Sequence, residues 1–448
     1  MRIFLMLLCA IISCFTWPQS VLAQELSSTS ILAQSNNFFA MDLYARLKGQ
    51  PGNLFLSPYS VSTALAMTHA GASGNTAREM EQVLRIMLEP DLWDQAFLEY
   101  RTMLDGAQGQ EFVVANSLWG QTGQVFIPEF LARIKEYHAA ELDQVDFSKP
   151  AVAVGRINTW VEDKTRGKIQ TILMPENVNS TTRLVLVNAV YFKGNWAKPF
   201  QKIHTQNHRF RLSTGQEKVV PTMNQVEHFL YMEDDLVQVV ELSYAGEDLS
   251  MVIFLPKERR GLEGQAVVST VEDALNSDRY KSWLLKLTDT EVDLTLPKFK
   301  SMAQFSLAQV LSDMGMPDAF SSSADFSGMS DEGELFISDV IHKACVNVGE
   351  EGTEAAAVTA VAMQENAIVF DTPSTSAVVV MVDHPFFFVI RDRSSNSILF
   401  MGRVMDPQVG GRPVSEVLGG MWSEVVSQAL QSQIKNKPQP PVVGEDEK

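Results

Sequence analysis

The sequence predicts a protein of the α+β class, in which helices come mainly first and strands mainly later along the chain. Apolar residues recur at helical spacing up to about residue 165, whereas short apolar runs bounded by turn residues dominate from about residue 208. The two kinds of segment do not alternate regularly, which argues against a doubly wound sheet. A chain of 448 residues, 45% hydrophobic and 20% charged, also has enough apolar material for a sizeable core.

The N-terminal residues are typical of an export signal. Arg2 precedes an apolar run at 3–12, and a small-residue cleavage pattern ends at Ala23, so residues 1–23 are predicted to be a signal peptide. The run is too short for a membrane span. This interpretation predicts secretion, either to the extracellular space or to a periplasm. A second interpretation stays open, because the sequence IISC that ends at Cys14 resembles a bacterial lipoprotein box, which would anchor the protein by a lipid.

The first half of the chain is expected to be mainly helical. Helical spacing extends over 38–47, and Ser57-Pro58 is a typical helix start ahead of a helix at 61–67. Two strands are expected among the helices, and the second is almost continuously apolar, as in a strand buried on both faces. The further helices are predicted at 79–87, 92–103 and 151–161, and the two strands at 112–118 and 184–192.

The second half is expected to consist mainly of strands, with one late helix at 306–314. The predicted strands cover 237–242, 251–255, 292–296, 335–341, 378–382, 386–390 and 398–404. A segment between two of them, 349–376, is long, uncharged over most of its length after Glu354, and rich in Ala, Val, Thr and Ser. A loop of this length inside a compact domain is either functional or disordered.

The C-terminal residues form an extension to the predicted domain, which covers residues 24–408. Within the extension, 409–448, apolar residues fall on one face of a predicted helix at 413–435. This helix either binds a partner or packs on the domain itself. The residues after it are acidic and rich in proline, which predicts a disordered tail.

Composition and motifs exclude several function classes. The net charge of −18 argues against a nucleic-acid partner, because phosphate backbones require a basic surface. The chain has no Gly-rich phosphate loop, no zinc-binding His-Glu-x-x-His helix and no Gly-x-Ser-x-Gly motif. His204 and His208 have metal-ligand spacing but no Asp, Glu or Cys nearby. We therefore expect no metal, no cofactor and no enzymatic activity. The third cysteine, Cys345, would remain alone after signal cleavage, so no internal disulfide is expected.

Seven short motifs occur along the chain in the order found in one family. They are 53–60 (NLFLSPYS), 188–196 (NAVYFKGNW), 296–299 (LPKF), 324–329 (ADFSGM), 342–344 (HKA), 350–357 (EEGTEAAA) and 384–392 (HPFFFVIRD). With these motifs, the chain resembles the serpins, a family of serine protease inhibitors, from about residue 28 to residue 407. The resemblance implies three β-sheets, about nine helices and an exposed reactive-centre loop.

The resemblance also implies a mechanism. A target protease attacks the loop as a substrate and forms a covalent acyl-enzyme, and the cleaved loop then inserts into the main sheet from Gly352 onward. The inhibitor would be a monomer whose partner is the protease. The family's hinge maps onto Glu350, Glu351, Gly352, Thr353, Glu354, Ala355, Ala356 and Ala357. A salt bridge between Glu350 and Lys298 and the packing of Trp196 would form a "breach" beside the hinge. A hydrogen-bonded gate, the "shutter", would consist of Ser57, Ser60, Asn188 and His342.

The residues of the loop themselves favour insertion. Alternate side chains of an inserted strand face the core. Counted from Thr353, the inward positions carry only small or β-branched residues, and Glu354 falls outward. An unpaired charge facing inward would cost several kcal/mol. The pattern favours an inhibitor over a flexible linker and over a non-inhibitory serpin that acts as a carrier or chaperone.

The family places the reactive bond at a nearly fixed distance after the hinge glycine, and the resemblance therefore implies the bond Asn366-Ala367 when that distance is counted from Gly352. Counting back from His384 reaches Ser374 instead, so the loop is longer than the family pattern, and we favour the hinge count because insertion depends on that side. The neighbouring candidates are Glu365, Ile368, Val369 and Phe370. No Lys or Arg occurs at 352–382, so an elastase-, chymotrypsin- or subtilisin-like target is expected rather than a trypsin-like one. A cysteine protease is the alternative target.

Overall fold

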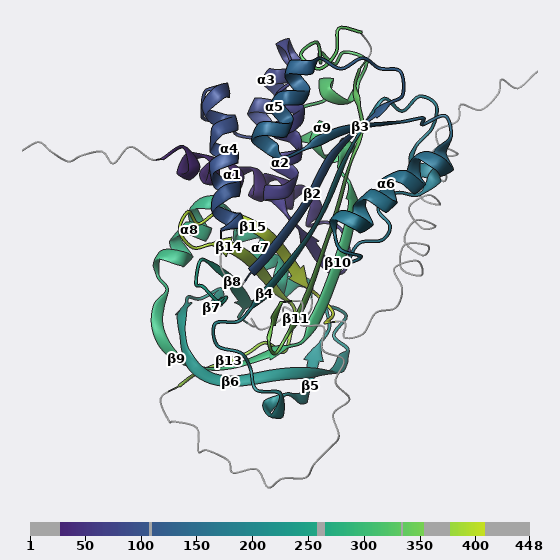
Figure 1. Cartoon of the computed structure of the whole chain (residues 1–448). Helices are drawn as coiled ribbons and strands as arrows, with labels where there is room; N and C mark the ends of the chain where they lie inside the picture. The colour runs from purple at the N-terminus through teal and green to yellow at the C-terminus, as the bar shows by residue number, and fades with distance from the viewer. Residues whose placement is uncertain (1–26, 107–109, 258–264, 333–334, 354–376, 408–448) are drawn as a thin grey trace, which may run out of the picture.

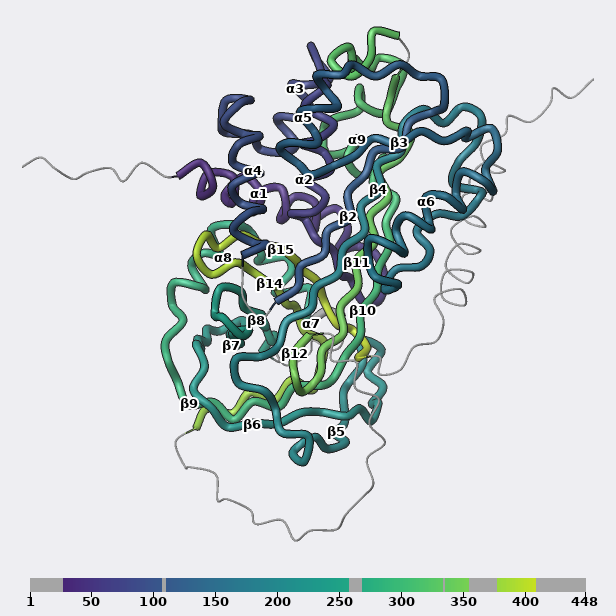
Figure 2. The backbone as a smooth tube through the Cα atoms, in the orientation of Figure 1, coloured from purple at the N-terminus to yellow at the C-terminus, as the bar shows by residue number. Residues whose placement is uncertain are grey.

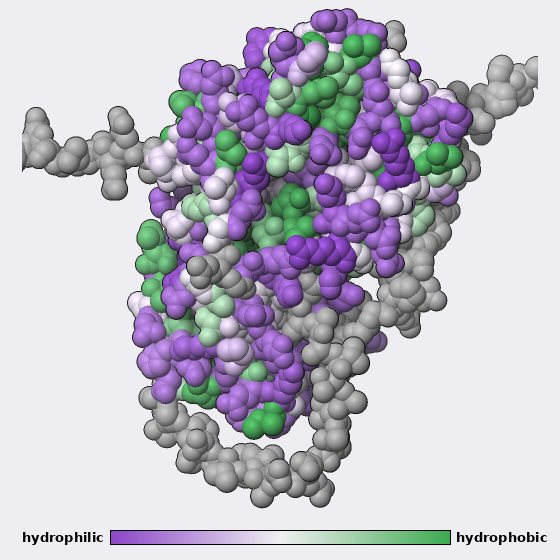
Figure 3. All heavy atoms as spheres, in the orientation of Figure 1, coloured by the Kyte–Doolittle hydropathy of each residue, from purple (hydrophilic) through white to green (hydrophobic). Residues whose placement is uncertain are grey.

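A computed structural model describes residues 27–106, 110–257, 265–332, 335–353 and 377–407. Within these ranges the chain forms nine α-helices and fifteen strands, which confirms the α+β class. Hydrophilic residues cover most of the face seen in Figure 3. Several predictions lie outside the described residues: the signal peptide with Cys14, the C-terminal extension, the hinge residues Glu354, Ala355, Ala356 and Ala357, and the reactive-bond candidates Glu365, Asn366, Ala367, Ile368, Val369 and Phe370.

The first five helices gather at one end of the molecule (Figure 1). The side chain of Ser27 caps the first, and Ser57 caps the second, whose first residue is Pro58. The second helix is buried along nearly its whole length and contacts strands of both sheets, so its N-terminus lies deep in the molecule. These helices are α1 (Ser28–Leu47), α2 (Pro58–His69), α3 (Gly74–Val83), α4 (Pro90–Asp105) and α5 (Pro128–His138).

A six-stranded sheet, called here the main sheet, runs through the molecule. Its strand order is β10 (Phe299–Ser306), β11 (Ile337–Gly349), β12 (Gly352–Thr353), β4 (Leu184–Asn195), β2 (Gln110–Gln121) and β3 (Glu141–Val145). The strand β4 is almost continuously buried because α6 (Pro150–Lys164) packs on one face of the sheet and α2 contacts it as well. This agrees with the prediction of a strand covered on both sides.

The other sheet has nine strands. The path is β1 (Leu54–Leu56), β15 (Ile398–Val404), β14 (Phe386–Asp392), β8 (Leu249–Pro256), β7 (Val237–Ser243), β6 (Glu217–Glu233), β9 (Thr288–Pro297) and β13 (Val378–Met381), and β5 (Gln206–Arg211) pairs with β6. The resemblance implies three sheets in total. Two of these three sheets form the single nine-stranded sheet, because the 17-residue strand β6 pairs with β5 near its start and with β7 near its end.

All of the individually predicted strands are present, but several helix boundaries differ from the predictions, and α1 begins ten residues before the predicted start at 38. The late helix α9 (Ala308–Met314) starts two residues later than predicted, because Ser306 still pairs with Ile341 at the end of β10. Helix α3 ends at Val83 instead of residue 87, since Arg85 adopts a positive φ of 56° that a helix cannot continue through. Helices α5, α7 (Gln265–Ala274) and α8 (Ser277–Leu285) were not predicted from the sequence.

Candidate functional site

The central strands of the main sheet part at one end. Strands β4 and β11 are parallel and directly paired from Leu184 and Ile337 to Tyr191 and Cys345. Beyond that point β12 lies between them, antiparallel to both: Gly352 is opposite Gly349 on β11 and Asn195 on β4. Figure 2 shows β12 beside these strands. The first two residues after the turn at 350–351 therefore already occupy the place of a further central strand.

Gly352 is required by the closeness of the neighbouring backbone. Its φ is +151°, and a Cβ at this position would lie 2.0 Å from the carbonyl oxygen of Gly194 and 2.6 Å from Cα of Asn195. Any side chain would push β12 away from β4. Thr353 follows with its side chain buried and its hydroxyl 2.7 Å from the Tyr244 hydroxyl. Thr353 thus faces inward, as the predicted alternation requires.

At the breach, the carboxylate of Glu350 is held on two sides. Lys298 Nζ lies 2.8 Å from Glu350 Oε2, and the Thr205 hydroxyl donates to Glu350 Oε1 at 2.9 Å. Burial alone would raise the pKa of Glu350, but the hydrogen bonds from Lys298 and Thr205 outweigh it and hold that pKa below its usual value. The carboxylate is therefore a charged anchor for the hinge at neutral pH.

Trp196 ties the segment after β4 to the same turn. Its indole Nε1–H donates to the Gly349 carbonyl at 3.0 Å, and its backbone N–H donates to the Glu351 carbonyl at 2.9 Å. The ring stacks on Tyr244 with the centroids 4.6 Å apart and an interplanar angle of 11°. A second ion pair, Lys202 with Glu351 at 2.8 Å, lies on the exposed side of the turn. The breach thus combines aromatic packing with ion pairs that are partly open to solvent.

The shutter residues lie where β4 and β11 are still paired. Asn188 and His342 are direct cross-strand partners, and the imidazole Nδ1–H donates to Asn188 Oδ1. The backbone N–H of Ser57 donates to His342 Nε2 at 3.0 Å, and Asn188 Nδ2 donates to the carbonyl oxygen of Ser60 at 3.0 Å. Asn116 on β2 accepts from Asn188 as well. The start of α2 therefore bridges the two strands through buried hydrogen bonds.

His342 is neutral in this arrangement. A backbone N–H can only donate, so the Nε2 atom that faces Ser57 is the acceptor and the proton is on Nδ1. The side chain is fully buried, and this burial lowers its pKa from 6.5 to about 3. Phe305 covers the ring in a stacked geometry, with centroids 6.2 Å apart. Both ring nitrogens are hydrogen-bonded without any charge.

The structure brings the predicted site residues together in two places. Lys298, Trp196 and the hinge residues Glu350, Glu351, Gly352 and Thr353 meet at the breach, and Ser57, Ser60, Asn188 and His342 meet at the shutter. Three further residues contribute to these sites and were not predicted from the sequence, namely Thr205, Tyr244 and Asn116. Only Asn116 had a local signal, because it is a polar residue inside a predicted strand.

Two kinds of feature are absent from the described residues. Across these ranges, no group of three or more His, Cys, Asp or Glu side chains is placed to hold a metal ion. Likewise, no helix in the described part of the chain is long and apolar enough to cross a membrane.

Comparisons with known proteins agree with the fold and with the motifs. A family model described as serpin (serine protease inhibitor) matches residues 34–407. An uncharacterised serpin-like protein of Thermococcus kodakarensis is 41% identical over 377 residues, which cover 84% of this chain and 85% of that protein. The leukocyte elastase inhibitor of Bos taurus is 40% identical over 386 residues, covering 84% of this chain and 99% of the inhibitor.

Two solved structures are similar over the same part of the chain. Serpin48 of the insect Tenebrio molitor, described as a highly specific serpin, has a TM-score of 0.74 and 33% identity, with 84% of this chain and 98% of that one covered. Human thyroxine-binding globulin complexed with its ligand has a TM-score of 0.76 and 30% identity, with 85% and 100% covered. The same architecture therefore occurs in a serpin described as highly specific and in a globulin that binds thyroxine.

Proposed function

The chain belongs to the serpin family, and from that premise we propose that it is a suicide inhibitor of serine proteases. The observation that carries the proposal is the position of β12 between β4 and β11. A strand that has begun to form between two parted strands provides a starting point for the insertion of the residues that follow it.

In the proposed mechanism, the loop after Thr353 acts as a substrate for the target protease. The serine hydroxyl of the protease attacks the carbonyl carbon of Asn366, the peptide bond to Ala367 breaks, and the new amine leaves with a proton. The ester that remains joins the protease to the loop. Extension of β12 from Thr353 then separates β4 from β11 and carries the bound protease along the main sheet before water can hydrolyse the ester.

Two features favour inhibition over a carrier function. Thr353 is buried in the sheet, and the next inward positions by alternation, 355 and 357, are alanines, whose methyl groups need little space and no hydrogen-bond partner. The backbone of Gly352 already packs against Gly194 without a gap. One relative is named leukocyte elastase inhibitor, and inhibition of such an enzyme is the kind of activity that we propose, whereas the related thyroxine-binding globulin binds thyroxine.

The proposed targets are elastase-, chymotrypsin- or subtilisin-like enzymes, since the loop carries no Lys or Arg for a trypsin-like pocket. A cysteine protease remains the second candidate, because it forms an analogous thioester. We further propose that the protein is exported by the signal at 1–23, or anchored by a lipid on Cys14, and that it acts as a monomer.

The function is tested by mixing the purified protein with pancreatic elastase, chymotrypsin and subtilisin. We expect an SDS-stable complex with at least one enzyme, and a released C-terminal fragment that begins at Ala367. Cleavage in the loop without a complex and without a gain in thermal stability would contradict the proposal.

A pair of hinge variants sharpens this test. Ala355→Arg places a charge at an inward position, where an unpaired buried ion costs several kcal/mol, so we expect cleavage with a complex yield reduced at least about tenfold. Ala356→Arg places the same charge outward and should retain most of the complex. Equal yields for the two variants would show that the loop does not insert in this register.

A further inference from the structure

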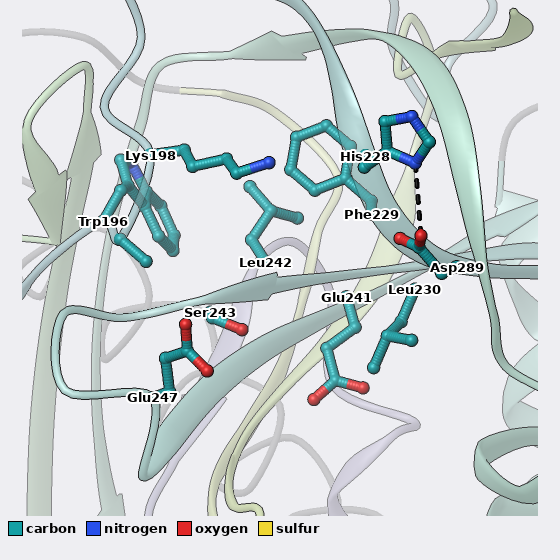
Figure 4. Close-up of a pocket in the computed structure, with 11 residues that line it drawn as sticks. Trp196, Lys198, His228, Phe229, Leu230, Glu241, Leu242, Ser243, Glu247 and Asp289 are labelled. Carbon is teal, nitrogen blue, oxygen red and sulfur yellow. Dashed lines mark hydrogen bonds and ion pairs between the residues drawn. The ribbon is translucent and has the colours of Figure 1, made fainter.

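A cavity beside the breach shares only Trp196 with the site described above. Its volume is about 160 Å³, and it lies between the segment that follows β4, the middle of β6, the end of β7 and the turn after β7. Figure 4 shows the side chains around it. The lining residues that matter for recognition are Trp196, Lys198, Phe229, Leu242, Ser243 and Glu247.

The floor of the cavity is apolar and aromatic. Leu242, Trp196 and Phe229 are all buried, and Figure 4 shows Leu242 between the two rings. An apolar cavity of about 150 Å³ is large enough for a benzene-sized ligand. Flanking aromatic rings favour another aromatic ring through edge or offset contacts. The floor therefore fits one aromatic ring.

Opposite charges stand on the two sides of this floor. In Figure 4 the ammonium of Lys198 lies on one side of Leu242, and the carboxylate of Glu247 lies with Ser243 on the other. Lys198 pairs with Glu227 at 2.9 Å with both side chains about half exposed, at 51% and 44%. Glu247 is 73% exposed and lies 3.7 Å from Arg393. Such exposed pairs contribute little, so a ligand can replace them at small cost.

The other acidic groups of the lining do not oppose a ligand carboxylate near Lys198. Glu241 accepts two hydrogen bonds from Arg391, at 2.8 and 2.9 Å, and its carboxylate points away from Lys198 in Figure 4. Asp289 pairs with His228 at 3.2 Å at the far side of the cavity. The lining thus has a cationic side and an anionic side around an apolar centre.

We propose that this cavity binds a small zwitterion with one aromatic ring, of the chemical class of an aromatic α-amino acid. The ring lies on Leu242, the carboxylate of the ligand pairs with Lys198, and its ammonium group pairs with Glu247 and donates to the Ser243 hydroxyl. The proposal does not depend on inhibitory activity. Trp196 forms a wall of the cavity while its indole donates to the Gly349 carbonyl, so the cavity lies directly beside the breach.

The test is calorimetric titration of the full chain with three probes that share one ring. L-phenylalanine carries both charges, phenylacetate carries only the carboxylate, and phenethylamine carries only the ammonium. We expect L-phenylalanine to bind at least about tenfold more tightly than either of the others, as the loss of one charged contact implies. Equal affinity for phenylacetate would overturn the role of Glu247, and no binding of L-phenylalanine at about 10 mM would overturn the site.

Variants locate the binding. Lys198→Gln should weaken L-phenylalanine binding about tenfold, and Leu242→Phe should abolish it by filling the cavity. Lys202→Gln is the matched control, since Lys202 lies on the same segment but pairs with Glu351 outside the cavity, and it should bind normally. Circular dichroism checks that Leu242→Phe is folded, and if it is not, Lys198→Gln decides. Unchanged binding in Lys198→Gln would contradict the proposal.

Discussion

The breach and the shutter join the same two strands by different chemistry. At the shutter, β4 and β11 are in direct register, and His342 and Asn188 join them through neutral hydrogen bonds that are closed to solvent. At the breach, the strands have already parted around β12, and Lys298, Trp196 and Glu350 hold the turn by an ion pair and by aromatic packing. A loop that inserts from Thr353 therefore reaches the parted strands at the breach first. It reaches the directly paired strands at the shutter next.

This difference predicts where the resistance to opening lies. Parting the strands at the shutter leaves buried polar groups without their hydrogen-bond partners, and each unsatisfied group costs about 1–3 kcal/mol. Lengthening β12 at the breach leaves the ion pair of Glu350 in place, because Lys298 and Thr205 lie outside the parted strands. We infer that the shutter dominates the stability of the closed sheet, and the following predictions test that ranking.

The largest effect is expected for His342→Ala. The substitution leaves the Ser57 N–H and the Asn188 Oδ1 atom without their buried partner and opens a cavity beneath Phe305. We expect the free energy of unfolding to fall by about 3–5 kcal/mol, measured by denaturant unfolding. His204→Ala, at an exposed position, is the control and should change little. A loss below about 1 kcal/mol for His342→Ala would reverse the ranking.

A smaller loss in the free energy of unfolding is expected when the pH falls from 7 to 5. The pKa of His342 is about 3 in the folded protein and near 6.5 in the unfolded chain, so the unfolded chain takes up the proton first. The stability from this group is complete above pH 6.5 and declines as the pH falls toward 3. We expect a loss of about 2 kcal/mol between pH 7 and pH 5. Glu350, whose pKa lies below 4.5, does not contribute in this window, because its stabilisation declines only at more acidic pH.

The contribution of His342 is isolated by comparing its pH profile with that of His342→Gln. Other histidines titrate in both proteins, so the difference between the two profiles should contain the single proton of His342. Parallel profiles from pH 7 to pH 5 would contradict a neutral buried imidazole. Should the variant fail to fold, the nitrogen chemical shifts of His342 in the wild-type protein decide instead, since they should not change down to pH 5.

The sequence predicted much of this site because its elements are local. The buried strand that carries Asn188, the helix start at Ser57-Pro58 and the alternation from Thr353 all follow from short-range patterns. The pairing of Lys298 with Glu350 and the assignment of Ser57, Ser60, Asn188 and His342 to the shutter came from the resemblance. Tyr244 and Thr205 were missed because they meet the hinge across 109 and 145 residues of chain. Such contacts depend on how the strands pair, and local periodicity does not encode that pairing.

The unpredicted helix α5 shows the same limit on a smaller scale. Its buried residues Phe130, Ile134 and His138 have helical spacing, but only three of its eleven residues are buried. A stripe that narrow gives a weak periodic signal. The helix is secured instead by tertiary contacts, with Arg133 and His138 both bonded to the buried Asp94 on α4.

The smallest effect is expected at the breach, for Lys298→Met. The methionine keeps the aliphatic packing but leaves Glu350, whose side chain is 10% exposed, with Thr205 as its remaining side-chain partner. A fully buried pair would cost about 3–5 kcal/mol to break, but Lys298 is 30% exposed, so we expect a loss of about 1–2 kcal/mol in denaturant unfolding. The neighbouring pair of Lys202 and Glu351 is about half exposed on both sides, and Lys202→Gln should cause no measurable change. If Lys298→Met cost as much as His342→Ala, the charged end of the sheet and not its neutral centre would control opening. A cost for Lys202→Gln equal to that for Lys298→Met would show instead that burial does not set the strength of these pairs.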